Sequence, residues 1–257
     1  MYIELDDLRQ SYVVAVNEIR KFIRGKKILV YGLMTLLIFV LWTILPFAAG
    51  ENFSDFYGDS NGIMALYLIF ISTLIVIGVT LFASNVIVSE FEERTALVLF
   101  TRPIKKTSIF LGKMVGCVVV EMLFILLYYL GLAAVMLIIE GKVPVELFKY
   151  LGMAFMYVLA ASGVAMLISS LLKKSGIAAV LTFFTLTLII SMVSLAISLT
   201  DVDPWFMLDQ ASNALSPSSA NIPLVGMIEV GRAAMVMLAW SIVTMVLAWI
   251  AFIKREF

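Results

Sequence analysis

The stretch ILVYGLMTLLIFVLWTILPFAAG, from Ile28 to Gly50, contains no charged residue. An α-helix rises 1.5 Å per residue and crosses the apolar core of a bilayer in about 20 residues. The stretch is therefore long enough to span a membrane. It is longer than the apolar region of a signal peptide, and acidic residues precede it, so we expect the span to be retained.

Stretches of the same character recur along the chain, and together they predict six spans, at residues 28–50, 62–88, 109–139, 150–172, 177–199 and 232–253. Hydrophobic residues make up 63% of the 257 residues and charged residues 14%. Soluble domains average roughly 45–50% and about 25%. The composition excludes a soluble globular domain, a disordered chain and a nucleic-acid binder. We expect an all-α integral membrane protein with a single transmembrane domain over residues 1–257.

Several kinds of chemistry are excluded by residue content. The chain has no histidine and a single cysteine, Cys117, so Ser-His-Asp and Cys-His catalysis, Cys/His zinc clusters and an intrachain disulfide cannot form. A phosphate-binding loop of the form GxxxxGK[ST] is missing, because Gly112-Lys113 is followed by Met114. We expect no catalytic residue, no metal site and no cofactor in the chain itself.

Basic residues are distributed unevenly between the two sides of the spans. All but three of the 18 Lys and Arg residues lie before the first span, between the second and third spans or at the start of the third, after the fourth, or at the C-terminus. The exceptions are Lys142, Lys149 and Arg232, and acidic residues predominate on their side. Because basic loops remain in the cytoplasm, we expect both termini to be cytoplasmic in a multi-pass protein of the cell membrane. An even number of spans requires the same agreement.

Residues 1–27 carry an apolar stripe at three- and four-residue steps, formed by Leu8, Tyr12, Val16, Ile19 and Ile23. Polar and basic residues fall largely on another side of the same helix. The pattern predicts an amphipathic helix lying on membrane lipids at the inner surface. The alternative is a plain cytoplasmic extension of the first span.

The loop between the second and third spans, residues 89–108, reads SEFEERTALVLFTRPIKKTS. Five consecutive apolar residues, Ala96 to Phe100, follow an acidic cluster in a segment that should meet water. A short helix with an apolar face and a charged rim needs a partner that shields the apolar face from water. That partner is either lipid or a protein groove, and the residues alone leave both alternatives open.

This loop resembles the cytoplasmic loop of ABC type-2 transporter permeases. Those loops combine an acidic cluster, a threonine, a leucine-rich stretch, an Arg-Pro step and a Leu-Gly-Lys sequence that opens the next span. The matching residues here are Glu90, Glu92, Glu93, Thr95, Leu97, Leu99, Arg102, Pro103, Leu111, Gly112 and Lys113. Arg94 departs from the pattern, because many relatives have glycine there. The six-span layout and the N-terminal helix resemble the family as well.

The resemblance implies a permease subunit of an ATP-driven exporter. It would work with a second permease copy, as a homodimer or heterodimer, and with separate cytoplasmic ATP-binding subunits that bind the ATP and Mg. The chain itself would then have no enzymatic activity. The N-terminal helix would be a connecting helix, and the loop would be a coupling helix that contacts the ATPase through Glu90, Phe91, Glu92, Glu93, Arg94, Thr95, Leu97, Leu99, Arg102 and Pro103.

Polar residues within the spans are candidates for a transport path. Glu121 is the ionisable residue deepest in a predicted span, and it is either a polar point on the path or a hydrogen-bonded tie between helices. The fifth span carries one face of hydroxyls, which either line a path or bond back to the preceding turn: Thr187, Ser191, Ser194 and Ser198. Gly112 and Gly116 form a GxxxG pair, which predicts close helix contact.

Residues 200–231 form an extracytoplasmic loop that is apolar and interrupted by prolines, so short re-entrant or interfacial helices are expected there. Two other function classes are alternatives. A motor-independent secondary transporter or channel would use Glu121 as its coupling acid, but matching broken spans are not evident. An intramembrane enzyme would need paired acids, a histidine or a Ser–base dyad at depth, and a single glutamate does not meet that need.

Overall fold

The computed structural model describes residues 5–50, 52, 56–92, 104–200, 202–217 and 229–255. Within these residues all regular secondary structure is helical. Six segments are long and apolar enough to cross a membrane: Lys26–Ala48, Ser60–Phe82, Lys106–Glu140, Glu146–Leu171, Ser175–Ser198 and Val230–Lys254. The all-α membrane class and the six spans predicted from the sequence are therefore confirmed.

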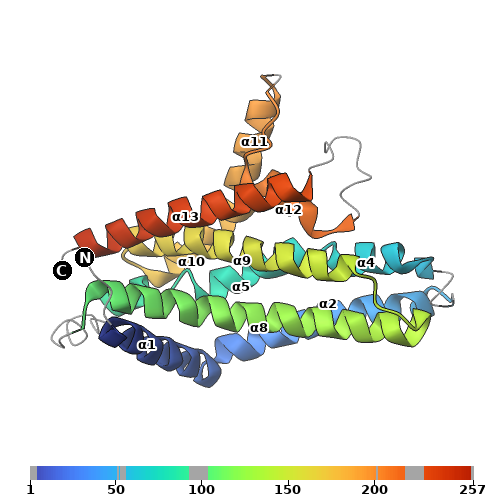
Figure 1. Ribbon diagram of the computed structural model, residues 1–257, viewed down its shortest axis with the longest axis horizontal. Helices are drawn as coiled ribbons and strands as arrows, with labels where there is room; N and C mark the ends of the chain where they lie inside the picture. The colour runs from blue at the N-terminus through green and yellow to red at the C-terminus, as the bar shows by residue number, and fades with distance from the viewer. Residues whose placement is uncertain are drawn as a thin grey trace.

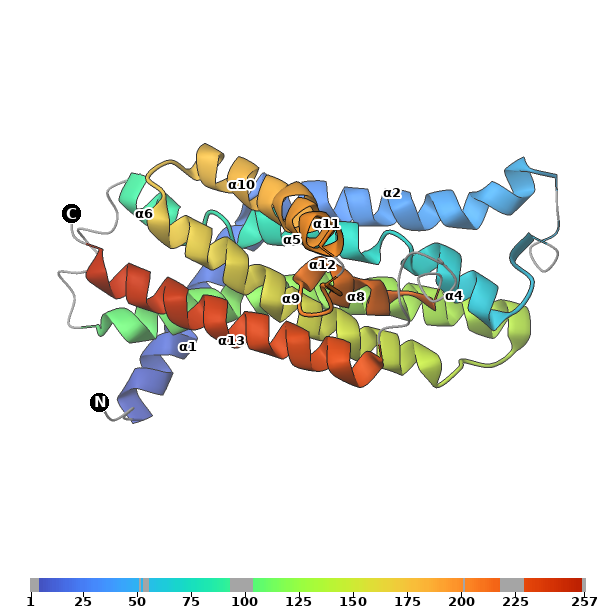
Figure 2. The same cartoon turned by 90° about the horizontal axis from the view of Figure 1, so that it is seen from above.

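The N-terminal helix α1 (Leu5–Arg24) and the first span, α2 (Lys26–Ala48), are separated by Gly25 alone. The extended backbone of Gly25 (φ −85°, ψ 148°) breaks the helix there. α1 consequently runs obliquely to the long axis of the bundle and crosses the first part of α8 (Lys106–Glu140), as the two views show (Figure 1, Figure 2). α2 lies at the periphery, with only 11% of its apolar window buried.

The second span consists of two helices, α4 (Ser60–Leu68) and α5 (Ile71–Phe82). Helical geometry ends at Phe82, before the expected end of this span at residue 88. The turn that follows is held by Ser169, whose hydroxyl accepts the backbone N–H groups of Ile87 and Val88 at 3.2 and 3.1 Å. A second short helix, α6 (Val88–Glu92), begins directly after this turn.

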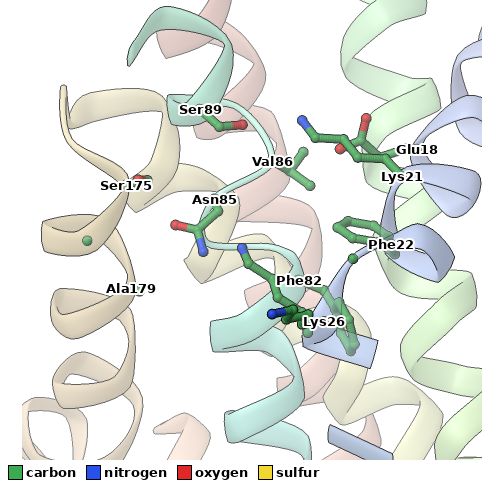
Figure 3. Close-up of a pocket in the computed structure, with 13 residues that line it drawn as sticks. Glu18, Lys21, Phe22, Lys26, Phe82, Asn85, Val86, Ser89, Ser175 and Ala179 are labelled. Atoms are coloured by element: carbon green, nitrogen blue, oxygen red, sulfur yellow. The ribbon is translucent and has the colours of Figure 1, made fainter. Parts of the chain in front are cut away.

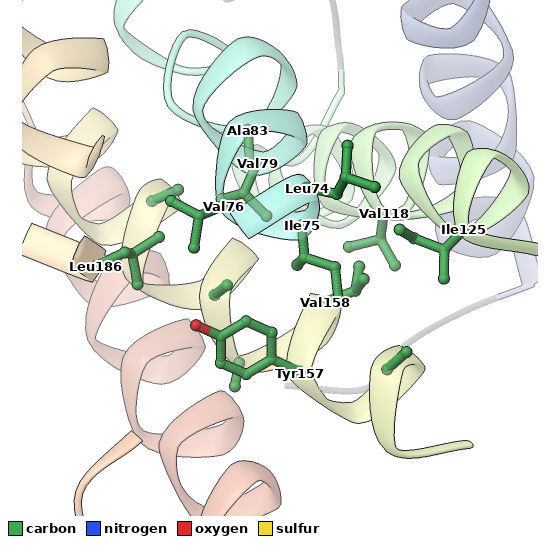
Figure 4. Close-up of a cluster of buried hydrophobic side chains, with 14 of the residues drawn as sticks. Leu74, Ile75, Val76, Val79, Ala83, Val118, Ile125, Tyr157, Val158 and Leu186 are labelled. Carbon is green, nitrogen blue, oxygen red and sulfur yellow. The ribbon is translucent and has the colours of Figure 1, made fainter. Parts of the chain in front are cut away.

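The core lies around α5 and α9 (Glu146–Leu171). The apolar window of α9 is 67% buried and that of the second span 56%, the highest values among the six spans. α9 pairs most extensively with the last helix, α13 (Val230–Lys254), and also contacts α5 and α8. Figure 4 shows side chains from α5, α8 and α9 meeting in one cluster that includes Leu74, Ile75, Val79, Val118, Ile125 and Val158. The bundle is thus filled by its own side chains.

The fifth span contains an irregularity that the sequence did not predict. A π-helical turn, η1 (Thr185–Ile189), connects α10 (Ser175–Phe184) to α11 (Ile190–Ser198). α11 projects away from the other helices (Figure 1), and only 22% of the apolar window of this span is buried. The outer loop then forms one short helix, α12 (Leu208–Ser212), and a 3-10 turn, η2 (Asn213–Leu215); residues 218–228 lie outside the described part.

One end of the bundle gathers α6, the first turns of α8 and α10, and the last turns of α9 and α13, with α1 lying across it (Figure 2). We call it the basic end, because most of the lysines and arginines are found there. The start of α1 and the end of α13 share this end, as an even number of spans requires. That the basic end faces the cytoplasm remains a prediction.

Candidate functional site

α6 contains the first described part of the predicted coupling region, residues 89–92, and it lies at the basic end. Three of its side chains, Glu90, Phe91 and Glu92, each contact a different set of helices. These contacts determine which spans would move together with the loop.

Glu90 is paired with a buried lysine. Lys113 lies in α8 with 3% of its side chain exposed, and its Nζ lies 2.7 Å from Glu90 Oε1 and 3.1 Å from Glu18 Oε2 of α1. Taking a charge out of water costs several kcal/mol, so a buried lysine requires such partners. Lys21 of α1 approaches the same Glu90 oxygen at 3.8 Å, in a more exposed position. The cluster joins α1, α6 and α8.

The backbones of α1 and α8 approach closely at the GxxxG pair. A Cβ added to Gly112 would lie 2.6 Å from the carbonyl oxygen of Ser11 and from Cβ of Val14. At Gly116 it would lie 3.0 Å from Cβ of Glu18. The close contact predicted from the two glycines therefore exists, and its partner is the N-terminal helix.

The face of α1 that is turned toward the bundle carries both acidic and apolar residues. Asp7 and Glu18 are buried, whereas Leu8, Tyr12 and Ile23 of the apolar stripe are more than half exposed. Lys105, the residue just before α8, forms an ion pair with Asp7, with its Nζ 2.8 Å from Asp7 Oδ2. The outward apolar stripe leaves a surface that lipid can cover, and the location of α1 in the membrane interface remains a prediction.

Phe91 packs within the protein. The guanidinium of Arg255 lies 3.9 Å from the centroid of its ring, and Phe252 of α13 meets it edge-on at 6.5 Å. Arg255 also donates to the carbonyls of Ser170 and Leu172 at 3.1 and 2.6 Å, at the end of α9 where carbonyls have no intrahelical partner. Burial lowers the pKa of Arg255. Phe91 thereby connects α6 to α9 and α13, and its contact with an ATPase remains a prediction.

Glu92 holds the start of the fifth span. Its Oε2 accepts the backbone N–H of Ser175, the first residue of α10, at 2.8 Å. A carboxylate at this position satisfies a donor that lacks an intrahelical partner and lies at the positive end of the helix dipole. The hydrogen bond to Ser175 lowers the pKa of Glu92.

The other predicted coupling residues lie outside the described residues: Glu93, Arg94, Thr95, Leu97, Leu99, Arg102 and Pro103. The chain is fastened to the bundle on both sides of them. α6 precedes them, and the ion pair between Lys105 and Asp7 follows. A force on residues 93–103 would consequently reach α1, α8, α10 and α13 through contacts that the structure describes.

Glu121 is fully enclosed where α8 meets α2 and α5. A Cβ added to Gly78 of α5 would lie 2.9 Å from Glu121 Oε1 and 2.7 Å from the hydroxyl oxygen of Tyr31 of α2. The backbone of Val79 interacts with the carboxyl, yet no hydrogen bond of normal geometry reaches either carboxyl oxygen from the described residues. Tyr31 instead donates to the carbonyl of Leu74 at 3.2 Å. The carboxyl faces the protein interior as expected, and its role in transport is untested.

The hydroxyls of the fifth span have different surroundings. Thr187 and Ser198 donate to the carbonyls four residues earlier, at 2.7 and 3.0 Å, which is one of the two alternatives left open by the sequence. Ser194 is buried and accepts a hydrogen bond from Gln210 of α12 at 3.1 Å. Ser191 is partly exposed. That these residues line a path remains a prediction.

Sequence reasoning did not single out Glu18, Ser169 or Arg255. A signal for Glu18 was present, because Asp7, Ser11 and Glu18 recur on one face of the predicted helix, opposite the apolar stripe. A polar face that repeats with helical spacing beside a GxxxG pair on another helix indicates a contact between them. Ser169 and Arg255 act on backbone groups that only the tertiary structure brings near.

A search of curated proteins finds no match to the chain. The family model described as ABC-2 family transporter protein matches residues 51–250. The matched region begins after the first span and contains the second to the fifth spans, α6, Glu121 and nearly all of α13. It extends over most of the chain and agrees with the six spans and the resemblance of the loop. The chain therefore belongs to the ABC-2 family of transporter proteins, as a multi-pass membrane component.

Proposed function

We propose that the chain is the permease subunit of an ATP-driven exporter. Separate ATP-binding subunits on the cytoplasmic side would supply the energy, and a second permease copy would complete the transport path. Family membership supports the first part of this proposal. The observation that carries the coupling is the arrangement of α6, which Glu90, Phe91 and Glu92 connect to α1, α8, α9, α10 and α13.

In this mechanism ATP binding draws the two ATP-binding subunits together, and residues 93–103 follow them. The movement reaches α8 through the ion pair between Glu90 and Lys113, and reaches α1 through Glu18. The backbone contact at Gly112 keeps α1 and α8 together, so both helices shift as one unit. Gly25 is the point where this unit can change its angle to α2.

The transport path would form between two copies of the chain. The interior of one bundle is occupied by side chains such as Leu74, Ile75 and Val79, which have no exposed surface, so a single copy offers little internal space. α11 and α2 present apolar faces outward and are available for contact with lipid or with a second copy. The direction proposed is export, and the family resemblance supports it.

The test is purification of the tagged full-length chain from its own host membranes, followed by measurement of MgATP hydrolysis in the eluate. The wild type is expected to retain a bound ATPase. Leu97→Asp places a charge in the apolar stretch of the loop and is expected to abolish the bound ATPase activity. Val202→Asp adds the same charge in the predicted extracytoplasmic loop, at an exposed residue, and is the matched control.

Loss of ATPase with Leu97→Asp and retention with Val202→Asp would support the coupling site. A wild-type chain that purifies without any ATPase and still transports after reconstitution would contradict the proposal. That result would favour the motor-independent secondary transporter.

A further inference from the structure

A cavity of about 510 Å³ opens at the basic end, beside the contacts that hold α6. The end of α1 and the start of α2 form one wall, the start of α10 forms the opposite wall, and the turn after α5 lies behind them (Figure 3). Three lysines line it: Lys21, Lys26 and Lys27. The proposed coupling mechanism involves Glu18 and Gly25 of its lining, but it assigns no role to these lysines.

The charges around the cavity favour an anion. Glu18 is the acidic residue among the lining side chains, and it is already paired with Lys113 at 3.1 Å. Lys21 lies 3.8 Å from Glu90 in a half-exposed pair, and pairs of this kind contribute little. Lys26 is exposed and lines the opening. The lysines therefore outnumber the carboxylates, and a bound anion would be attracted.

Polar groups also lie at the back of the cavity. Lys27 Nζ donates to the carbonyl of Leu81 at 3.3 Å. In the amide orientation that satisfies both of its side-chain atoms, Asn85 donates to the carbonyl of Ser175 at 2.8 Å and accepts from Lys27 at 3.0 Å. These contacts hold Lys27 and Asn85 in place, so the cavity is a formed site between the first, second and fifth spans.

An apolar surface continues from the opening along the spans. Val30 and Leu33 follow Lys26 on the same face of α2 and are 50% and 65% exposed. Val180 and Phe183 are exposed on α10, beyond the part of that helix that lines the cavity. A molecule with an anionic head and apolar tails matches both surfaces, whereas a free inorganic anion would use only the lysines.

We propose that this cavity binds the headgroup of an anionic glycerophospholipid from the leaflet at the basic end. Its phosphate would lie among Lys21, Lys26 and Lys27, and its acyl chains would run against the exposed faces of α2 and α10. Basic pockets between spans on the cytoplasmic side are suited to such headgroups. The bound lipid would bridge the first and fifth spans. This inference depends on the membrane fold and the cavity, and not on the proposed exporter function.

The test uses the purified full-length protein in bilayers that contain spin-labelled phosphatidylglycerol or spin-labelled phosphatidylcholine. Electron spin resonance measures how strongly each lipid associates with the protein. The wild type is expected to prefer phosphatidylglycerol. Lys26→Gln is expected to reduce that preference by roughly fivefold, the effect of one charge near the membrane surface. Lys254→Gln removes an exposed charge at the same end, outside the cavity, and is expected to change nothing.

A second variant separates binding from general attraction. Ala179→Trp fills the cavity without changing charge, and it is expected to remove the preference as Lys26→Gln does. An equal preference in the wild type and both variants would overturn the proposal. Inorganic phosphate that displaces phosphatidylglycerol at low concentration would also overturn it and indicate a site for free anions. A shift in oligomeric state with Ala179→Trp, at unchanged lipid preference, would identify a contact between copies instead.

Discussion

Lys113 Nζ lies 2.7 Å from Glu90 Oε1, which joins the third span to the short helix at the start of the preceding loop. The same lysine contacts Glu18 of the N-terminal helix at 3.1 Å, so three separate parts of the chain meet at one buried charge. Both carboxylates pair with Lys113, and Glu90 has the more exposed Lys21 as a second cation at 3.8 Å. The arrangement therefore fixes α6 and α1 relative to α8, and it makes the cluster sensitive to the loss of any one member.

Lys113→Met is expected to destabilise the protein strongly. It removes the cation from two carboxylates that have little access to water, and breaking a buried pair in this way costs about 3–5 kcal/mol. The measurement is thermal or denaturant unfolding in detergent, followed by tryptophan fluorescence. The double variant with Glu18→Gln is expected to recover part of the loss, because one uncompensated carboxylate is then neutral.

The control for this variant is Lys105→Met. Lys105 also pairs with a carboxylate of α1, Asp7, at 2.8 Å, but 48% of its side chain is exposed. Exposed pairs contribute about 0–1 kcal/mol, so the loss is expected to be small. Equal losses for Lys113→Met and Lys105→Met would show that burial of the Lys113 cluster does not determine its contribution.

Gly112→Ala is expected to push α1 away from α8. The added Cβ would lie 2.6 Å from backbone and side-chain atoms of α1, and overpacking of this kind costs about 1–3 kcal/mol. Gly116→Ala meets its nearest atom at 3.0 Å and is expected to cost less. Hydrogen–deuterium exchange of α1 is the measurement, with faster exchange expected for Gly112→Ala.

Gly152→Ala is the matched control for the helix contact. Gly152 lies inside α9, and a Cβ there would have no atom within 4 Å. Alanine in a helix interior is favoured over glycine by roughly 0.5–1 kcal/mol, so this variant is expected to be slightly more stable. Faster exchange of α1 in Gly152→Ala than in Gly112→Ala would contradict the assigned packing.

The spans could be predicted from the sequence because their signal is local. The length and apolarity of a charge-free run such as Ile28–Gly50 can be read directly from the sequence. The helix found there is Lys26–Ala48. The end of the second span was predicted too late, at residue 88. The apolar run continues past Phe82, but the helix ends there because Ser169, a residue of another span, stabilises a turn. The apolar run alone does not indicate this contact.

The candidate site could be predicted only in part, because its contacts join distant residues. The motif of the loop identified Glu90 and Lys113 as family residues. Lys113 pairs with Glu90, 23 residues away, and with Glu18, 95 residues away. Hydrophobic periodicity does not predict contacts between residues so far apart in the sequence. The π-helical turn at Thr185–Ile189 has no local signal either, since its residues are ordinary for a span.

Stability is expected to depend on pH through Glu92. Because the hydrogen bond from Ser175 lowers the pKa of Glu92 in the folded protein, its stabilising effect is present at neutral pH. The effect is lost as the pH falls below the ordinary pKa of a glutamate and through the lowered folded value. Glu92→Gln is therefore expected to unfold at a lower temperature than the wild type at neutral pH, and the two curves are expected to converge in acid.

Ser175→Pro provides the control for the Glu92 experiment. Proline lacks the N–H donor but is tolerated at the first position of a helix, and the extended backbone of Lys174 suits a following proline. In the Ser175→Pro background Glu92→Gln is expected to have no further effect at neutral pH. A full effect of Glu92→Gln in that background would show that the hydrogen bond is not its cause.

Glu121→Met distinguishes the two interpretations of the buried carboxyl. Glu121 has no exposed surface, and hydrogen bonds of normal geometry to its carboxyl oxygens are missing among the described residues, so its burial costs stability. Replacing it by an apolar side chain of similar length is expected to raise the free energy of unfolding by about 1–3 kcal/mol. A carboxyl that ties helices together would give the opposite sign. The measurement is thermal unfolding of the purified protein.

Function is measured on the same residue with Glu121→Gln, which keeps the shape and removes the ionisable group. The variant is expected to assemble normally, by its elution volume and bound ATPase, and to alter MgATP hydrolysis by the reconstituted complex. An ionisable group that is buried in a span and lowers stability is a candidate for a role in the transport cycle. Stabilisation by Glu121→Met together with altered hydrolysis in Glu121→Gln would therefore assign Glu121 to the transport cycle. Unchanged hydrolysis would remove it from that cycle, whatever the effect on stability.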